Sequence, residues 1–223
     1  MADRSNIKRR SMMSEVMTRF MRKPTAVLGT CILFVIIVLC LLAPVIAPYD
    51  YDAQDITRQF TEPCREFICG TDNLGRDLFS RLLYGGRVSL MVGFFSAFTA
   101  AFFGVILGAI AAFYGKKVDN IIMRFLDIFM ALPQTLLAIV IAAMIGTGIK
   151  GAVIAVTVAT IPRYAQAVRG PILAIRNQEF VEAAVALDAK DSRIILKHIL
   201  PNVLSPIIVQ VTMGVGSAIT MAA

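Results

Sequence analysis

The 223-residue sequence contains one histidine, no tryptophan and only four cysteines. A single histidine excludes a histidine-rich metal site, and four cysteines are too few for a disulfide scaffold. Cys31 and Cys40 lie inside an apolar run, where cysteine is typical of a small packing residue. Cys64 and Cys69 lie in a polar segment, where they could form a disulfide in an oxidising compartment or remain free thiols.

Catalytic and nucleotide-binding motifs are also missing. The sequence has no HExxH, GxSxG or CxxC motif. Gly108–Lys117 resembles a phosphate-binding loop superficially, but its spacing is wrong, no Ser or Thr follows the lysine, and no strand precedes it. Charges within the apolar runs are too few for a proton relay, although Asp127 leaves that alternative open. We therefore expect no enzyme activity, no catalytic residue, no bound metal and no cofactor.

What the sequence does contain is long apolar runs. Hydrophobic residues make up 57% of the chain, which is typical of a polytopic membrane protein. The net charge of +7 could suggest nucleic acid as a partner. The basic residues instead flank the apolar runs, as the positive-inside rule requires. The expected partner is thus the lipid bilayer and not nucleic acid.

The apolar runs predict an all-α protein with about five membrane spans. The predicted organisation is a basic, cytoplasmic N-terminal tail at 1–24, a first transmembrane helix at 25–47, an extracytoplasmic loop at 48–87 and a transmembrane core at 88–223 with a cytoplasmic loop at 163–201. Counting the crossings from a cytoplasmic N-terminus agrees with the distribution of basic residues. Because the sequence ends at Ala223 within an apolar run, we expect the protein to be incomplete at its C-terminus.

Local features refine these segments. Asp77–Leu83 predicts a short amphipathic helix lying in the membrane interface. Pro133 lies within the predicted span Ile121–Ile145 and should kink it. The fourth span is expected to end near Pro162, where a basic cytoplasmic segment begins.

Small residues recur at every fourth position of the predicted second span. Such a stripe lets two helix backbones approach closely in lipid, so it predicts a helix–helix seam. The alternative is the general abundance of Gly and Ala in membrane helices. The stripe consists of Ser96, Ala100, Gly104, Gly108 and Ala112.

Arg124 and Asp127 are the charged residues of the first turns of the predicted third span. Their spacing places them on one helical face, and ionisable groups in a span usually face protein or water. They could form a conformation-sensitive ion pair lining the cytoplasmic mouth of a pathway. The alternative is a local salt bridge at the membrane interface.

Glu179–Pro201 is polar, although apolar runs flank it. Asn177 can cap a first short helix, on which Phe180, Ala184 and Leu187 share one face. Asp188–Lys190 should end that helix, Asp191 can cap a second at Ser192–Leu200, and Pro201 should limit it. Two short helices with a shallow apolar face suit insertion into a groove on a soluble partner, and the alternative is an ordinary re-entry loop.

The same segment resembles a known motif. Glu182-Ala183-Ala184, the bend at position 188 and Ile199-Leu200-Pro201 resemble the EAA loop of permease subunits in bacterial ABC importers. Further strings resemble the peptide/nickel subfamily, and especially the second permease of the pair. They are IAPYD (Ile46–Asp50), GTDNLGRDLFSRLLYGGRVSL (Gly70–Leu90), MRFLDIFMALP (Met123–Pro133) and HILPNVLSPIIV (His198–Val209).

This resemblance implies a type I ABC importer transmembrane fold of six spans, in the bacterial cytoplasmic (inner) membrane. It also implies a second permease subunit, two cytoplasmic ATPase subunits and an extracytoplasmic solute-binding protein. The residues implied to couple this chain to an ATPase are Phe180, Glu182, Ala183, Ala184, Leu187 and Asp188, and the loop would end at Ile199, Leu200 and Pro201.

Asp188 departs from the family pattern, which has glycine at this position. A left-handed residue that ends the helix explains the glycine, and aspartate tolerates that conformation at a cost of about 1 kcal/mol. The function expected is therefore import of di- or oligopeptides by alternating access, with nickel or glutathione-like peptides as other family substrates. The alternatives are an ion-coupled secondary carrier without ATPases and a membrane scaffold.

Overall fold

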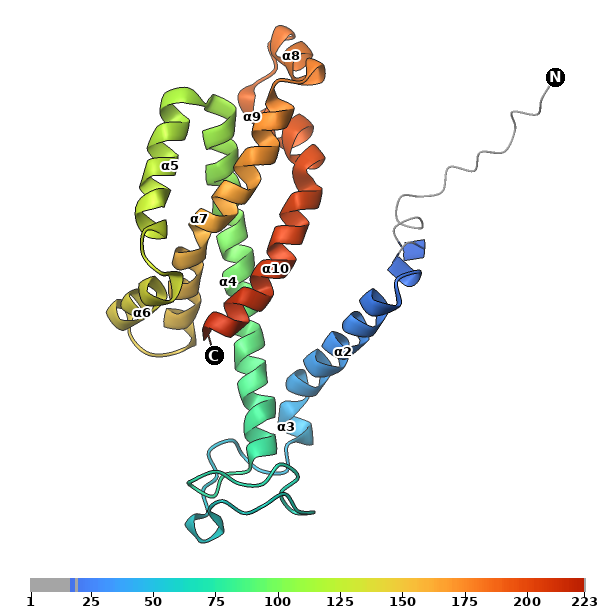
Figure 1. Ribbon diagram of the computed structural model, residues 1–223, viewed down its shortest axis with the longest axis vertical. Coiled ribbons are helices and arrows are strands. Elements are labelled where there is room, and N and C mark those ends of the chain that lie inside the picture. The colour runs from blue at the N-terminus through green and yellow to red at the C-terminus, as the bar shows by residue number, and fades with distance from the viewer. Residues whose placement is uncertain (1–16, 19, 223) are drawn as a thin grey trace, which may run out of the picture. The chain divides into compact units, whose positions relative to one another are not determined.

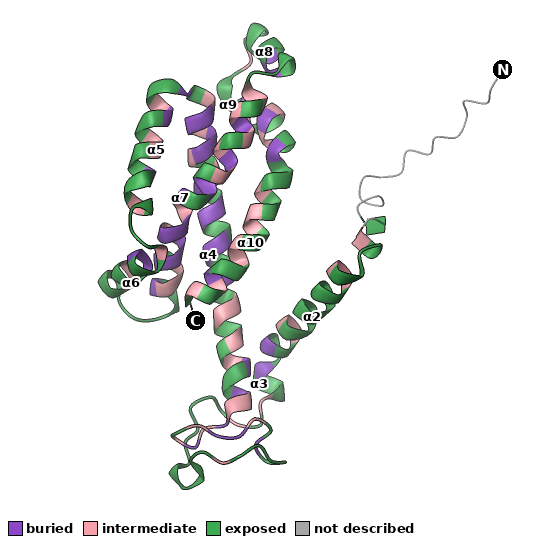
Figure 2. Cartoon of the chain, in the orientation of Figure 1, coloured by how far each residue is buried: buried purple, intermediate pink, exposed green. Residues whose placement is uncertain are grey.

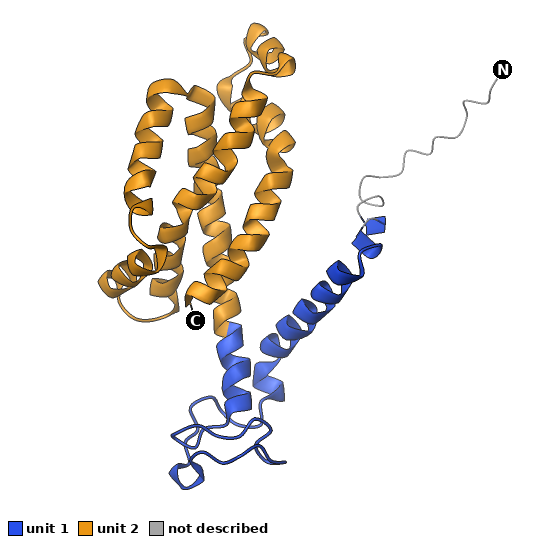
Figure 3. Cartoon of the chain, viewed as in Figure 1, with its two compact units in different colours: residues 1–87 blue, residues 88–223 orange. Residues whose placement is uncertain are grey.

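The computed structural model describes residues 17–18 and 20–222, which divide into two compact units, residues 1–87 and 88–223 (Figure 3). Helices are the regular elements of the described residues, where the β-type pairing is a single isolated bridge between Thr71 and Asp77. The all-α class expected from the apolar runs is therefore confirmed.

The first unit begins with an apolar helical segment. Helix α2 (Pro24–Leu41) is followed directly by the short helix α3 (Ala43–Ile46). Proline suits the first turn of each helix because the backbone N–H that it lacks would have no partner there. Most side chains of α2 are exposed, with Cys40 as its buried residue (Figure 2). An apolar helix exposed in this way is suited to contact lipid or another helix.

The turn-rich stretch of the first unit is organised by Asp72. Its Oδ1 accepts hydrogen bonds from the backbone N–H groups of Leu74 at 2.8 Å and Arg76 at 3.0 Å, and the Arg76 and Arg81 guanidinium groups contact its Oδ2. Desolvation by burial raises the pKa of the Asp72 carboxyl, but these hydrogen bonds outweigh it and lower the pKa to about 2. The hydrogen bonds to the Asp72 carboxylate therefore hold this turn together.

Cys64 and Cys69 are free thiols in this structure. The Sγ atom of Cys64 accepts a hydrogen bond from the backbone N–H of Phe67 at 3.4 Å, and the Cys64 N–H donates to the Phe67 carbonyl at 2.9 Å. The Cys64 sulfur therefore takes part in the turn between the two cysteines, and a disulfide between them stays a prediction.

The interfacial helix predicted at Asp77–Leu83 is wrong as a separate element. Those residues form the first turns of α4 (Leu78–Tyr114), a helix of 37 residues. The Oδ2 atom of Asp77 accepts hydrogen bonds from the backbone N–H and the hydroxyl of Ser80, at 2.8 and 2.6 Å. Asp77 thereby caps α4, and no breaker separates these turns from the apolar run that follows.

The second unit is built around α7 (Ile149–Arg176), which contacts α5 (Lys116–Met130), α6 (Gln134–Ile145) and α10 (Leu204–Ala222) (Figure 1). Figure 2 shows that α7 carries many of the buried residues of this unit. The cytoplasmic loop predicted to begin at Arg163 is helical as far as Arg176, although α7 contains Pro162 and Pro171. Burial among neighbouring helices maintains a helix through prolines that would end an isolated one.

The predicted third span is two separate helices and not one kinked helix. Helix α5 ends at Met130, α6 begins at Gln134, and their axes differ by 86°. Pro133 lacks a backbone N–H and restrains the residue before it, so the helix stops instead of bending gently. The Gln134 side chain then donates a hydrogen bond to the Ala159 carbonyl on α7 at 3.1 Å. Four helices are long and apolar enough to span a membrane, or five if this bent pair counts as one span, in the described residues.

The small-residue stripe of α4 lies against α7. A Cβ atom built on Gly104 would come within 2.4 Å of the Tyr164 Cβ, and one on Gly108 within 2.5 Å of the Ala165 carbonyl oxygen. Ala100 and Ala112 have no exposed surface. The two backbones therefore approach so closely that only hydrogen fits at the two glycines.

Candidate functional site

The candidate site is the segment that follows α7 and precedes α10 along the chain (Figure 1). Its first element is α8 (Glu179–Ala186). Gln178 is the N-cap of α8 and makes no side-chain capping bond, so the prediction of Asn177 as the cap is wrong. Asn177 instead follows the last turn of α7. Glu179 and Glu182 lie in the first turn of α8, where negative charge complements the helix dipole.

Helix α8 ends at Ala186 and is followed by a Schellman motif that includes Asp188. The N–H of Asp188 donates to the Val185 carbonyl at 2.9 Å, and the N–H of Ala189 donates to the Ala184 carbonyl at 3.1 Å. The backbone of Asp188 is left-handed, with φ at 55°. The family motif has glycine at this position because glycine adopts the left-handed conformation without strain. In this chain aspartate adopts it, and both hydrogen bonds of the Schellman motif are formed.

This geometry predicts opposite effects for two substitutions of Asp188. Asp188→Gly removes the left-handed strain and should raise the free energy of unfolding by up to about 1 kcal/mol, whereas Asp188→Val should lower it by about 1–2 kcal/mol. Thermal unfolding of the purified chain in detergent checks both. Equal unfolding temperatures for the two variants would contradict the strain at this residue.

The buried face of α8 is not the face predicted from the sequence. Val181 and Ala184 are only 2% and 8% exposed and pack in one core cluster with Val168, Ile172 and Ile199. Ala184 therefore contributes mainly to the core that stabilises the loop itself. Sequence reasoning missed Val181, although the i, i+3 spacing of Val181 and Ala184 on one helical face is the signal that identifies such a pair.

The remaining sides of α8 are exposed. Phe180 is 39% exposed and Leu187 is 83% exposed, and Glu182 and Ala183 are exposed as well. Large apolar side chains exposed next to each other on a short helix are typical of an interaction surface.

The second half of the segment is continuous with α10. Helix α9 (Asp191–Arg193) passes into the π-helix η2 (Ile194–Ile199), the 3₁₀-helix η3 (Leu200–Val203) and then α10. The prediction that Pro201 limits the second helix is therefore wrong. The wider turn before Pro201 accommodates its ring, and the Asn202 side chain donates to the His198 carbonyl at 2.6 Å. Ile199 is fully buried, whereas Leu200 and Pro201 retain exposed surface.

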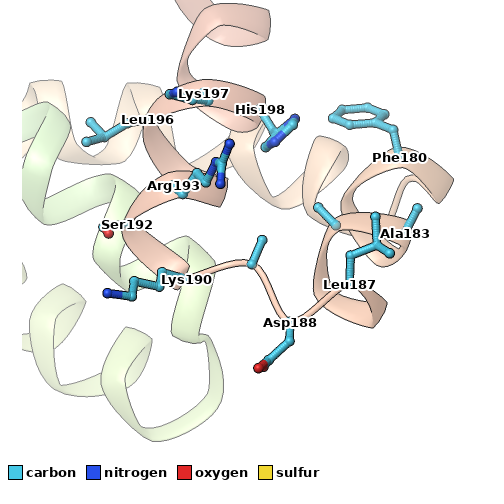
Figure 4. A pocket seen from close by; sticks show the side chains of 12 residues that line it. Phe180, Ala183, Leu187, Asp188, Lys190, Ser192, Arg193, Leu196, Lys197 and His198 are labelled. Atoms are coloured by element: carbon cyan, nitrogen blue, oxygen red, sulfur yellow. The ribbon is translucent and has the colours of Figure 1, made fainter.

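A groove of about 830 Å³ lies between α8 and the α9–η2 segment (Figure 4). The side chains from α8 are Phe180, Ala183, Ala184 and Leu187, and those after the bend include Lys190, Arg193, Leu196, Lys197 and His198. The buried residues Val181 and Ile194 fix the two walls to the same core. The groove is thus an open, preformed surface.

The ion pair expected between Arg124 and Asp127 is not formed. Among the described residues, the charged pair of this region joins Asp119 on α5 to Arg169 on α7, with two hydrogen bonds of 2.6 and 2.5 Å. Asp127 instead accepts a hydrogen bond from Gln166 at 3.2 Å, and Arg124 is exposed. Asp119 and Asp127 of α5 therefore both bind side chains of α7. Local spacing along the sequence could not identify these partners.

Two further contacts reach α4, one from the candidate site and one from the last residue of α7. The Tyr114 hydroxyl donates to Asp191 Oδ2 at 2.9 Å, and the Arg176 guanidinium donates to the Ala112 carbonyl at 3.2 Å. Asp191 lies in the first turn of α9 and is not its N-cap, which is Lys190. No cluster of three or more His, Cys, Asp or Glu side chains suited to a metal occurs in the part of the chain that the structure describes. The arrangement is therefore suited to binding and to mechanical linkage.

Known proteins match both parts of the chain. Residues 104–223 match the family described as the binding-protein-dependent transport system inner membrane component. Residues 11–63 match the N-terminal transmembrane domain of oligopeptide transport permease C.

Three curated relatives illustrate the similarity. The dipeptide transport system permease protein DppC of Alkalihalophilus pseudofirmus is 40% identical over 209 residues, which cover 94% of this chain and 69% of that protein. The oligopeptide transport system permease protein OppC of Bacillus subtilis is 36% identical over 98% of this chain and 72% of that protein. The glutathione transport system permease protein GsiD of Escherichia coli is 39% identical over 94% and 69%. The chain thus spans about two thirds of the length of these relatives.

A solved structure shows the same fold. A chain of the MetNI methionine ABC transporter, in an inward-facing conformation, matches with a TM-score of 0.55 at 22% identity, over 60% of this chain and 68% of that chain. The helices therefore adopt the transmembrane-domain fold of type I ABC importers. With these matches, the chain belongs to the family of binding-protein-dependent transport system inner membrane components.

Proposed function

We propose that this chain is one of two permease subunits of an ATP-driven importer. ATP binding and hydrolysis take place on two partner ATPases, and α8 transmits their movement to the membrane helices. The observation that carries the proposal is the exposed surface of α8, which presents Phe180 and Leu187 on one side and Glu182 on another, outside every candidate span of the described residues. An exposed apolar pair on a fixed helix is suited to docking on a soluble protein.

The contacts of the candidate site support transmission. Val181 and Ala184 join α8 to the core that contains Val168 and Ile172 of α7, and Tyr114 joins α9 to α4. Movement of α8 therefore reaches two helices of the second unit without a flexible linker. Alternation between outward and inward access would follow from rigid-body movement of these helices.

The proposed topology places the N-terminus and the α8 segment in the cytoplasm. The basic residues that flank the apolar runs support this orientation. The transported solute is proposed to be a di- or oligopeptide, because the relatives include proteins named for dipeptide, oligopeptide and glutathione transport. An extracytoplasmic solute-binding protein would deliver the peptide.

Reconstitution of the complete importer tests this function. With the second permease, both ATPases and the binding protein in proteoliposomes, we expect uptake of a labelled dipeptide that requires ATP and the binding protein. The control omits one component at a time. Uptake by this chain alone, driven by an ion gradient, would contradict the proposal and identify a secondary carrier.

A further inference from the structure

Cys64 and Cys69 lie in the segment that joins α3 to α4 (Figure 1) and have no part in the proposed coupling. The chain turns back on itself between them, because the Phe67 carbonyl accepts hydrogen bonds from the backbone N–H groups of Cys64 at 2.9 Å and Gly70 at 3.0 Å. A disulfide usually needs two Cα atoms about 4.4–6.8 Å apart, whereas five extended residues span about 17 Å. The turn therefore brings the two cysteines toward the separation that a disulfide requires.

Both of these thiols are accessible to an oxidant, since Cys64 is exposed and Cys69 is half-buried. The Sγ atom of Cys64 accepts a hydrogen bond from the Phe67 N–H at 3.4 Å. Sulfur is a weak acceptor, so little is lost when the Cys64 side chain rotates toward Cys69. The other two cysteines, Cys31 and Cys40, lie about 13 Å apart along helix α2 and are too distant to pair with each other.

We propose that Cys64 and Cys69 form a disulfide on the extracytoplasmic side of the membrane. The proposal rests on the topology of the proposed function, in which this segment faces an oxidising compartment. The oxidant is the disulfide of a thiol–disulfide oxidoreductase in that compartment. The pair is thus a modification site that closes the turn around Phe67.

The more exposed cysteine, Cys64, reacts first. Its thiolate attacks one sulfur of the oxidoreductase disulfide, which forms a mixed disulfide and releases the other oxidoreductase sulfur as a thiolate. The Cys69 thiolate then attacks Cys64 Sγ, which breaks the mixed disulfide and releases the second oxidoreductase sulfur. Two electrons thereby pass from the cysteine pair to the oxidoreductase, and the two thiol protons end on its two sulfurs.

The disulfide restrains the residue that anchors this segment. Phe67 lies within the ring that the bond closes and is only 5% exposed. Its side chain stacks on Tyr49, with ring centroids 5.3 Å apart, and the Arg58 guanidinium lies 5.5 Å from the Phe67 centroid. The Tyr49 N–H in turn donates to Ser80 Oγ on α4 at 3.2 Å. Closing the turn therefore stabilises the contacts that connect the end of α3 to the start of α4.

Trypsin provides a direct test, because the exposed Arg65 lies between the two cysteines. Cells that produce the permease are treated with N-ethylmaleimide to block free thiols, and the purified protein is digested without reductant. We expect the peptides 59–65 and 66–76 to be recovered as one linked species, two hydrogen atoms lighter than the separate peptides together and separable by dithiothreitol. In the folded protein, reduction should speed cleavage after Arg65 about fivefold, because the turn is then able to open.

Cysteine variants give the controls for this digestion. Cys64→Ser and Cys69→Ser should each remove the linked species, whereas Cys31→Ser should leave it unchanged. Recovery of both peptides labelled with maleimide, even after the purified protein is treated with oxidised glutathione, would overturn the disulfide. If the linked species formed only with oxidised glutathione, the disulfide in cells and the proposed orientation would both be wrong. ATP-dependent dipeptide uptake by the same preparation would then leave the transport function itself intact.

Discussion

Glu182→Lys is expected to abolish the ATP hydrolysis that depends on the permease, while leaving membrane insertion unchanged. Glu182 is exposed on α8 and makes no contact with a cation in the described part of the chain, so its carboxylate is free for the ATPase. Reversing a charge that is paired across an interface costs about 2–5 kcal/mol, which weakens the interaction about 30-fold or more. Stimulation of ATPase activity by the loaded binding protein, in reconstituted complexes, measures the effect.

Glu179→Lys is the matched control. Glu179 is exposed in the same first turn of α8, so both variants lose a similar interaction with the helix dipole and receive the same change of charge. Coupled hydrolysis should persist in Glu179→Lys. Coupled hydrolysis at the wild-type rate in Glu182→Lys would remove Glu182 from the proposed coupling surface.

Gly108→Leu is expected to disrupt the second unit. A Cβ at Gly108 would lie 2.5 Å from the backbone oxygen of Ala165, so the leucine side chain would have to displace α7. Overpacking of this kind costs about 1–3 kcal/mol or more, and backbone cannot yield as a flexible side chain can. We expect a lower unfolding temperature and a lower yield of folded chain in detergent, measured by thermal unfolding.

Gly216→Leu controls for the helix propensity and size of leucine. Gly216 lies in α10, where an added Cβ meets no atom within 4 Å. This variant should unfold at or near the wild-type temperature. If Gly108→Leu unfolded at the same temperature as Gly216→Leu, the close approach of α4 and α7 would not be required for stability.

Some features followed from local sequence. Apolar runs predicted the helices because a lipid environment leaves few other ways to satisfy the backbone. The four-residue stripe through Gly104 and Gly108 indicated a seam because it depends only on helical periodicity. The left-handed turn at Asp188 was also expected, because the end of a helix is decided by neighbouring residues.

Other features required the tertiary structure. Pro162 and Pro201 are strong helix breakers by local rules, yet packing and a compensating π-helix maintain helices through both. Asp119 pairs with Arg169, fifty residues away, although Arg124 and Asp127 are close in sequence.

The candidate site shows the same division. The sequence by itself determined that Glu179–Pro201 is a polar, helical segment with a bend at Asp188, because charge, periodicity and helix capping are local properties. Only the tertiary structure decided that Ala184 is buried and that Phe180 and Leu187 face the groove. That choice depends on which side chains of α8 meet the core formed by α4, α7 and the η2–η3 segment. The i, i+3 spacing of Val181 and Ala184 shows that they share a face, but it does not show that this face is the buried one.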